Sequence, residues 1–281
     1  MAIAIEQTLS ERDFKQIAAY IESNVGIKMP ETKRLMMQSR LAGRLRALGI
    51  PTYREYINYV FSKNGTNQDE LVLMIDALTT NLTEFFRESG HFDFMTGTAL
   101  PALAASGHHQ IKLWSAGCSS GEEPYTLSIV MQEFMRNNPG KINAYSVLAT
   151  DISTKVLNKA AEAVYALDSI KKLPLDMKRR YFLRSKNAAE PKVRVKADVR
   201  NRVSFARLNF MDDDFGFRDT MQIIFCRNVL IYFDKPTQEA VIRKFMQFLE
   251  TGGYLFLGHS ETIFGMNLPL KNVSPTVFQK V

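Results

Sequence analysis

The stretch of this sequence whose residue types most clearly suggest chemistry is "LWSAGCSSGEEPY", residues 113–125. It begins like a buried strand, turns through Gly117 and Gly121, and then meets Glu122 and Glu123. Glycines let a backbone approach a ligand closely. The two acids repel phosphate groups, and the GxxxG spacing matches neither the GxGxxG dinucleotide fingerprint nor a P-loop. The turn therefore suits a ligand that carries positive charge and no phosphate.

Two further strand ends carry polar residues that fit the same ligand. "AYSVLATD" ends in Asp151, and "MQIIFC" is followed by Arg227 and Asn228. Ligands of open α/β sheets bind at the carboxyl ends of the strands, and an acid after the second strand binds ribose hydroxyls. An adenosine with cationic groups and no phosphate describes S-adenosylmethionine. A structural alternative stays open for Glu122 and Glu123, because acids in the first turn of a helix commonly complement its dipole.

Two more stretches place polar side chains beside apolar ones. "TTNLTEFFRESGHF" carries Asn81, Thr83 and Arg87 around two phenylalanines, and "IIFCRNVLIYFD" carries Tyr232. Asn81 or Thr83 could instead cap a helix, and a tyrosine in an apolar run is more often a core residue than a catalytic one. None of the four histidines stands in a triad pattern, so the sequence assigns no catalytic role to His91, His108, His109 and His259.

The elements that position these residues follow from hydrophobic periodicity. Residues 10–76 predict a small all-helical unit, whose first helix has Ser10 as its N-cap and stops at Gly26. From residue 111 strands alternate with helices, which is typical of a largely parallel sheet covered by helices. The expected strands are 111–116, 144–151, 221–226, 252–259 and a final one within 275–281.

The predicted domain boundary lies where the all-helical pattern gives way to alternating strands and helices. We predict a helical N-terminal domain over residues 1–77 and an α/β domain over residues 78–281. Alternating "KVRVKADV" and "RVSFARLN" interrupt the α/β pattern and predict a small antiparallel β insertion over about 188–208.

Composition excludes several classes of protein. The chain has 281 residues, 46% of them hydrophobic, enough for an ordinary core. Cys118 and Cys226 lack the paired spacing of a metal site, so we expect neither a disulfide framework nor a metal. No basic leader opens the sequence, and no apolar run approaches the roughly 18 residues that span a bilayer. We therefore expect a cytoplasmic protein without membrane insertion.

The net charge of +7 is concentrated in two places. The segment Lys171–Arg207 holds thirteen Lys and Arg residues against three acids, a net charge of +10. In the helix expected over residues 29–49, Lys33, Arg40 and Arg44 fall within a narrow sector away from the leucines. Each group is either a solvated face or a dock for an acidic partner.

In order and spacing, "TTNLTEFFR", "WSAGCSSGEEPY", "ATDIS", "LNF" and "IFCRNVLIYFD" resemble the bacterial chemotaxis receptor protein-glutamate methyltransferases over essentially the whole chain. "CRNVLIYFD" and "TTNLTEFFR" are close to diagnostic, whereas many methyltransferases share the glycine turn. The resemblance implies a Rossmann-like, S-adenosylmethionine-dependent O-methyltransferase. It would esterify glutamates on the cytoplasmic methylation helices of chemoreceptors for sensory adaptation, releasing S-adenosylhomocysteine, with its helical domain docking on the receptor. We expect it to act as a monomer and not on nucleic acid.

The resemblance also implies a set of site residues. Arg87 and Tyr232 match the positions that face the reacting groups. The implied cofactor contacts are Asn81, Thr83, Arg87, Glu123, Asp151, Asn209, Phe210, Arg227 and Asn228. A glutamate with a reference pKa of about 4.3 is ionised at neutral pH, so its methylation needs orientation rather than a general base.

One departure from the family concerns the β insertion. Members that tether to a receptor C-terminal pentapeptide have a glycine-rich turn there, whereas "RSKNAAEPKVRV" contains no glycine. The sequence therefore predicts methylation but not this tethering. Two other classes stay open on the residues alone: a nucleic-acid methyltransferase, which would want an aromatic clamp for a flipped base, and a non-catalytic signalling module.

Overall fold

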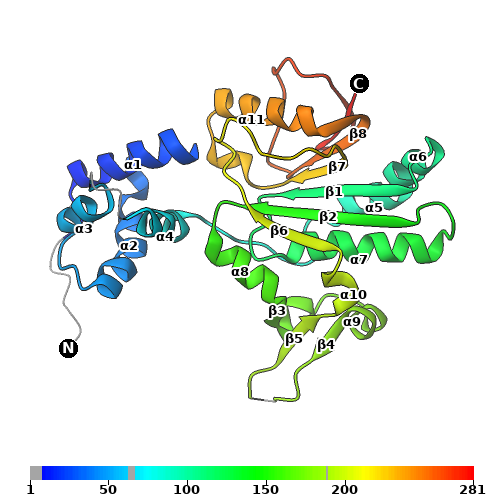
Figure 1. The fold of residues 1–281 in the computed structure, drawn as a ribbon, viewed down its shortest axis with the longest axis horizontal. Helices are drawn as coiled ribbons and strands as arrows, with labels where there is room; N and C mark the ends of the chain where they lie inside the picture. Colours follow the sequence, from blue (N-terminus) through cyan, green and yellow to red (C-terminus); the bar gives the residue numbers. More distant parts are fainter. Residues whose placement is uncertain (1–7, 63–66, 188) are drawn as a thin grey trace. The chain divides into compact units, whose positions relative to one another are not determined.

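The computed structural model describes residues 8–62, 67–187 and 189–281, which form two compact units (Figure 1). The first unit comprises Met1–Thr80 with Asn209–Asp213 and Tyr232–Thr237. The second comprises Asn81–Leu208, Asp214–Ile231 and Gln238–Val281. Residues 1–7, with which the predicted helical domain begins, and residue 188, where the predicted insertion begins, lie outside the described residues.

The first unit is built from helices whose ends follow local rules. Its helical segments are α1 (Glu11–Val25), η1 (Glu31–Lys33), α2 (Arg34–Leu48), α3 (Tyr53–Val60) and α4 (Gln68–Leu78). The Ser10 hydroxyl accepts from the Asp13 backbone N–H at 3.1 Å, and Gly26 ends α1 in the left-handed conformation at φ 78°. Both predicted ends of this helix are therefore confirmed.

The basic sector predicted along the second helix is not a free surface. Lys33 lies in the 3₁₀ turn η1, before α2 begins. The Arg40 guanidinium donates to the carbonyl oxygens of Leu78 at 2.7 Å and Thr79 at 2.9 Å, so it binds the last turn of α4.

Arg44 also binds a residue of the same unit. Its guanidinium donates to both carboxylate oxygens of Glu70, at 2.9 and 2.6 Å, and Glu70 is 5% exposed. The Tyr56 hydroxyl donates to the same carboxylate at 2.8 Å. Interpreting Arg40 and Arg44 as a solvated face was wrong, because helical periodicity does not reveal which other helix packs against a face.

The second unit is organised around a seven-stranded sheet in the order β6-β2-β1-β7-β8-β10-β9. Its strands are β1 (Gln110–Ala116), β2 (Ala144–Asp151), β6 (Val203–Arg207), β7 (Met221–Cys226), β8 (Leu249–Leu257), β9 (Leu270–Ser274) and β10 (Val277–Lys280). The first five pair in parallel, and β10 is antiparallel to both neighbours. The chain leaves β1 for β2 and β6, then returns to the other side of β1 as β7. The carboxyl ends of β2, β1 and β7 therefore meet at the topological switch point.

Helices cover both faces of this sheet, with α7 and α11 on opposite sides (Figure 1). Leu113 faces a core that includes Leu127 and Met131 of α7, whereas the next residue, Trp114, meets Phe245 of α11 with ring centroids 5.0 Å apart. This alternation is what a pleated strand imposes. The remaining helical segments are α5 (Gly90–Phe94), η2 (Met95–Ala99), α6 (Leu100–Ala105), α7 (Glu122–Asn137), α8 (Thr154–Glu162), η3 (Leu167–Ile170), α9 (Leu175–Tyr181), α10 (Ala197–Arg200), η4 (Leu230–Tyr232) and α11 (Lys235–Phe248). None of the described helices combines the length and apolar composition that crossing a membrane requires.

A separate three-stranded antiparallel sheet consists of β3 (Val164–Ala166), β5 (Lys192–Val195) and β4 (Phe182–Arg184), in that order. It begins upstream of the insertion predicted over about 188–208. "RVSFARLN" does not belong to it, since β6 pairs in parallel with β2 at the edge of the main sheet. Alternating polarity fits an edge strand of either sheet, so the sequence pattern could not distinguish them.

Candidate functional site

Packing around the turn after β1 requires glycine at two positions of that turn. Gly117 and Gly121 adopt left-handed φ values of 85° and 93°. A Cβ on Gly117 would collide with the Val229 side chain, and one on Gly121 would lie 2.8 Å from the Cβ of Ala160. The turn is thus pressed between the segment after β7 and helix α8.

Asp151 ends β2 with its carboxylate held by backbone N–H groups. Ser119 donates to Oδ2 at 2.8 Å and Ser153 donates to Oδ1 at 2.9 Å, and Asp151 is 8% exposed. These contacts therefore fix the orientation of the carboxylate at the carboxyl end of β2.

Glu123 and Arg227, both predicted to contact the cofactor, form a buried ion pair with each other. Nε of Arg227 donates to Oε2 of Glu123 at 2.7 Å, and Ser115 Oγ donates to Oε1 at 2.7 Å. The same guanidinium donates through Nη1 to the carbonyl oxygen of Arg87 at 2.7 Å. Arg227 thus joins the first turn of α7, the end of β7 and the segment that carries Arg87.

The segment around Arg87 has unusual backbone geometry. Phe86 and Glu88 have left-handed φ values of 56° and 55°, which non-glycine residues rarely adopt. Just before them, Phe85 packs edge to face on Tyr165 of β3, with ring centroids 5.0 Å apart. The half-buried Arg87 side chain donates to the Leu82 carbonyl at 3.0 Å. Such conformations cluster at functional sites and persist only where the surroundings hold them.

The start of the same segment touches the glycine turn. The Asn81 carbonyl accepts from Ser119 Oγ at 3.0 Å, and Thr83 is half-buried two residues later. The structure therefore brings this segment together with the residue that also donates to Asp151.

Glu261 is a site residue that the sequence analysis did not identify. Its buried carboxylate accepts from the backbone N–H of Asn228 at 3.0 Å. Burial raises the pKa of Glu261, and hydrogen bonds from backbone N–H groups oppose that rise. Asn228 itself has a left-handed φ of 59°, and its side-chain amide donates to Glu88 at 3.3 Å.

His91 is a second residue that was missed, four positions after Arg87. Its Nδ1 lies 3.1 Å from Nη1 of Arg227 and its Nε2 lies 2.9 Å from Thr276 Oγ1. Burial, and then the charge of Arg227, lower the pKa of His91 to about 4. Glu88, His91 and His259 bring potential metal-ligand atoms within 4.8 Å of one another. Since Arg227 donates to one of these atoms, its positive charge opposes a cation there.

Three predicted site residues belong to the first unit. The Asn209 side chain donates to the Asn24 carbonyl at 2.6 Å and accepts from the Met211 N–H at 3.1 Å. Phe210 is 8% exposed. The Tyr232 carbonyl accepts from the Lys28 N–H at 2.9 Å, and its ring lies 5.9 Å from the Lys33 ammonium. The other predicted residues, Asn81, Thr83, Arg87, Glu123, Asp151, Arg227 and Asn228, belong to the second unit.

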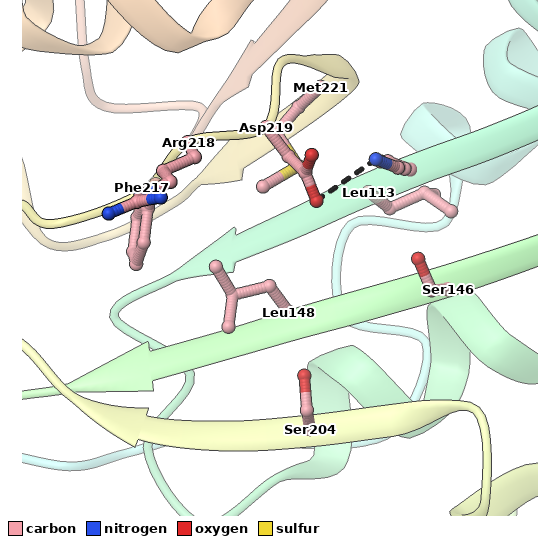
Figure 2. Close-up of a pocket in the computed structure, with 9 residues that line it drawn as sticks. Leu113, Ser146, Leu148, Ser204, Phe217, Arg218, Asp219 and Met221 are labelled. Carbon is pink, nitrogen blue, oxygen red and sulfur yellow. Dashed lines mark ion pairs between the residues drawn. The ribbon is translucent and has the colours of Figure 1, made fainter.

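A hollow of about 320 Å³ lies elsewhere on the second unit (Figure 2). Lys112, Ser146 and Ser204 line it from the first half of their strands, and Lys112 pairs with Asp219 at 3.0 Å. Ligands of parallel sheets bind at the opposite, carboxyl ends of the strands. The hollow is therefore not the predicted site.

The chemistry of the strand-end residues indicates which ligand they fit. After strands β1, β2, β7 and β8 and in the segment around Arg87, the arginines Arg87 and Arg227 accompany a larger set of acids: Glu88, Glu122, Glu123, Asp151 and Glu261. Glu123 is already neutralised by Arg227, yet an excess of carboxylates remains. This donor set suits a ligand with hydroxyl and cationic groups and disfavours a pyrophosphate.

Comparison with known proteins identifies that ligand. The all-alpha domain of CheR methyltransferases matches residues 12–79, and their SAM-binding domain matches residues 81–278. A chemotaxis protein methyltransferase of Borreliella burgdorferi is 40% identical over 97% of this chain and 95% of its own length. Those of Salmonella typhimurium and Escherichia coli are 39% and 38% identical, each over 90% of this chain, covering 84% and 85% of theirs.

These matches confirm the resemblance seen in the sequence, the predicted fold class and S-adenosylmethionine as the cofactor. The strand-end carboxylates fit that cofactor, which has ribose hydroxyls and two cationic groups and lacks phosphate. The chain belongs to the CheR methyltransferase family and is an S-adenosylmethionine-dependent methyltransferase.

Proposed function

We propose that the protein methylates glutamate side chains on the cytoplasmic methylation helices of chemotaxis receptors. The supporting observation is the extent of the likeness to the chemotaxis protein methyltransferase of B. burgdorferi, which spans 95% of that protein at 40% identity. Both the helical and the cofactor-binding domain are included. We further propose that it acts in the cytoplasm as a monomer, with residues 1–77 and 78–281 as its two domains.

The proposed chemistry asks the protein to orient rather than to activate its substrate. S-adenosylmethionine supplies an electrophilic methyl group on a sulfonium. The substrate carboxylate is already ionised at neutral pH, so alignment and exclusion of water provide the acceleration. The half-buried Arg87 side chain donates one hydrogen bond to the Leu82 carbonyl. Its guanidinium has further N–H groups that can pair with a carboxylate. Tyr232 would hold the same carboxylate through its hydroxyl.

The cofactor contacts are divided among residues with different constraints. Asp151 would accept from the ribose hydroxyls, since its carboxylate is fixed by two backbone N–H groups. The part of the cofactor site next to Asp151 would be lined by Glu123, Arg227 and Asn228. Asn81, Thr83, Asn209 and Phe210 complete the proposed set.

We propose that the protein docks on the receptor through the small antiparallel sheet. Arg40 and Arg44 bind groups of their own helical unit. Three cations on or next to strands β4 and β5 are exposed: Arg184, Lys186 and Arg194. Substrate glutamates imply an acidic surface beside the target, which exposed cations would attract. Docking through the helical domain, as first predicted, is the alternative that kinetics can test.

One assay tests the proposed function directly. Protein, labelled S-adenosylmethionine and receptor-containing membranes are incubated, and label released by base is collected. Methyl esters are base-labile, so we expect label on the receptor that base removes. Label on nucleic acid, or no transfer to receptors whose glutamates are intact, would contradict the proposal.

A further inference from the structure

Glu261 follows strand β8 and binds two separate turns at once. Its carboxylate accepts four backbone N–H groups, from Gly258 at 2.6 Å, Asn228 at 3.0 Å, Val229 at 2.9 Å and Leu230 at 2.8 Å. Gly258 belongs to the turn after β8, and the other three belong to the turn after β7. The Glu261 side chain is therefore a crosslink between the carboxyl ends of adjacent strands.

Only an ionised carboxylate satisfies this arrangement. A carboxylate offers acceptors alone, with about four lone-pair sites, and four N–H groups point at it. A glutamine at this position would direct an NH₂ group at backbone donors. Buried N–H groups left without an acceptor are costly, so the identity of this side chain matters more than its shape.

The crosslink acts on a strained residue. Asn228 has a φ of 59°, uncommon for a residue other than glycine, and its N–H is one of the four donors. A Cβ on Gly258 would lie only 2.6 Å from the side-chain Nδ2 of Asn228 and 2.8 Å from its backbone nitrogen. The turn after β7 is thus held in its left-handed form by the carboxylate on one side and by close backbone packing on the other.

We infer that Glu261 is a positioning residue, which holds Asn228 and the adjoining Arg227 in the orientation that binds S-adenosylmethionine. The inference rests on the proposed cofactor contacts of Arg227 and Asn228. It assigns Glu261 no contact with the reacting atoms, and it explains why a carboxylate is buried at the end of β8.

Isothermal titration calorimetry with S-adenosylhomocysteine tests this role on the full-length protein, well below the melting temperature of each variant. We expect Glu261→Gln to weaken binding by about tenfold or more, because several backbone donors lose their acceptor. Glu261→Asp keeps the negative charge on a side chain that is shorter by one methylene. The affinity of this variant for S-adenosylhomocysteine should therefore lie between those of the parent and Glu261→Gln. In initial-rate measurements, the KM for S-adenosylmethionine should rise by a larger factor than kcat falls.

Glu250→Gln is the matched control. Glu250 lies at the opposite end of β8, where it accepts from Thr220 Oγ1 at 2.7 Å. Its replacement removes a carboxylate charge that Thr220 and His108 contact at the amino end of the strand, so it should lower the melting temperature and leave the Kd within about twofold of the parent. This separates a loss of stability from a loss of positioning.

Two results would overturn the inference. One is Glu261→Gln binding S-adenosylhomocysteine as tightly as the parent. If that variant does not fold, parental affinity in Glu261→Asp has the same meaning. The other is a parent protein that does not bind S-adenosylhomocysteine, which removes the cofactor site and the inference with it. Loss of receptor methylation with normal cofactor affinity in the parent would instead count against the proposed substrate.

Discussion

The carboxylate of Asp151 is held by the protein before any ligand arrives. Asp151→Ala removes the proposed acceptor for the ribose hydroxyls, and we expect the affinity for S-adenosylhomocysteine to fall by about 2–4 kcal/mol. The Ser119 and Ser153 N–H groups also lose their acceptor, so the melting temperature should fall too. Calorimetry measures the first effect and a thermal melt the second. Asp219→Ala, at an exposed aspartate, is the control that should change neither. Unchanged affinity in Asp151→Ala would exclude the ribose contact.

Arg87 and Tyr232 should affect turnover rather than folding. A charged pair orients a carboxylate more strongly than one neutral hydrogen bond, so we expect Arg87→Ala to reduce kcat/KM for receptor more than Tyr232→Phe does. Melting curves should stay close to the parent's. Arg243→Ala and Tyr59→Phe, on exposed positions, provide matched controls. Parental methylation rates in both site variants would remove the assigned roles.

His91 should make the protein sensitive to mild acid. Its pKa is lowered to about 4 in the folded state, so the folded protein does not take up the proton that the unfolded chain binds near pH 6.5. Stability from this residue is therefore present above about pH 6.5 and lost as the pH falls toward 4. The full effect is roughly 3 kcal/mol. Arg227, Glu88 and His259 are the charged or titratable groups that influence it.

Urea unfolding at pH 7 and pH 4.5 checks the His91 prediction. His91→Gln keeps neutral hydrogen-bonding atoms and does not titrate, so the difference in unfolding free energy between the two pH values should shrink. His109→Gln, at an exposed histidine, should retain the parent's difference. An equal pH dependence in His91→Gln and the parent would show that His91 is not the responsible group.

At the scale of elements, the contact between α2 and α4 depends on a buried ion pair. Arg44→Ala leaves the buried Glu70 carboxylate without its cation, beside the Tyr56 hydroxyl, so we expect a loss of about 3 kcal/mol in the free energy of unfolding. Replacing Arg44 and Glu70 together by leucine should recover much of this loss, because no unpaired charge remains. Lys15→Ala breaks the exposed pair with Glu11 and should leave the melting curve close to the parent's. A melting curve unchanged by Arg44→Ala would contradict the structural role.

At the scale of the whole molecule, docking should depend on charge in a way that salt reveals. Alanine at Arg184, Lys186 and Arg194 together should raise the KM for receptor at low salt and leave cofactor affinity unchanged. The difference from the parent should shrink at high salt, because screening weakens the parent's own attraction. Initial rates against receptor concentration at both salt levels measure this.

A second variant tests the alternative docking site. Lys33→Ala with Arg46→Ala removes cations of the helical unit whose loss leaves the Glu70 pair intact. We expect its KM for receptor to match the parent's. If only this variant raises the KM, docking belongs to the helical domain and not to the small antiparallel sheet.

The sequence by itself determined those features that depend on neighbouring residues. The cap at Ser10, the stop at Gly26 and the limits of strands β2 and β7 were all predicted, because capping and periodicity are local effects. The motifs also identified the family and its cofactor, since the polar residues follow recognisable strands. Parallel strands bring their carboxyl ends together whatever lies between them.

Tertiary structure decided which polar groups pair with one another. The sequence indicated Glu123 and Arg227 as separate ligand contacts, yet they neutralise each other across 104 positions. It placed Arg44 on a basic face that was either solvated or a dock for a partner, yet Arg44 binds Glu70 on another helix. Glu261 gave no signal in the sequence, because three of its four donors belong to the turn after β7, more than 30 positions earlier. Which donor meets which acceptor depends on how strands and helices pack, and local periodicity carries no record of that packing.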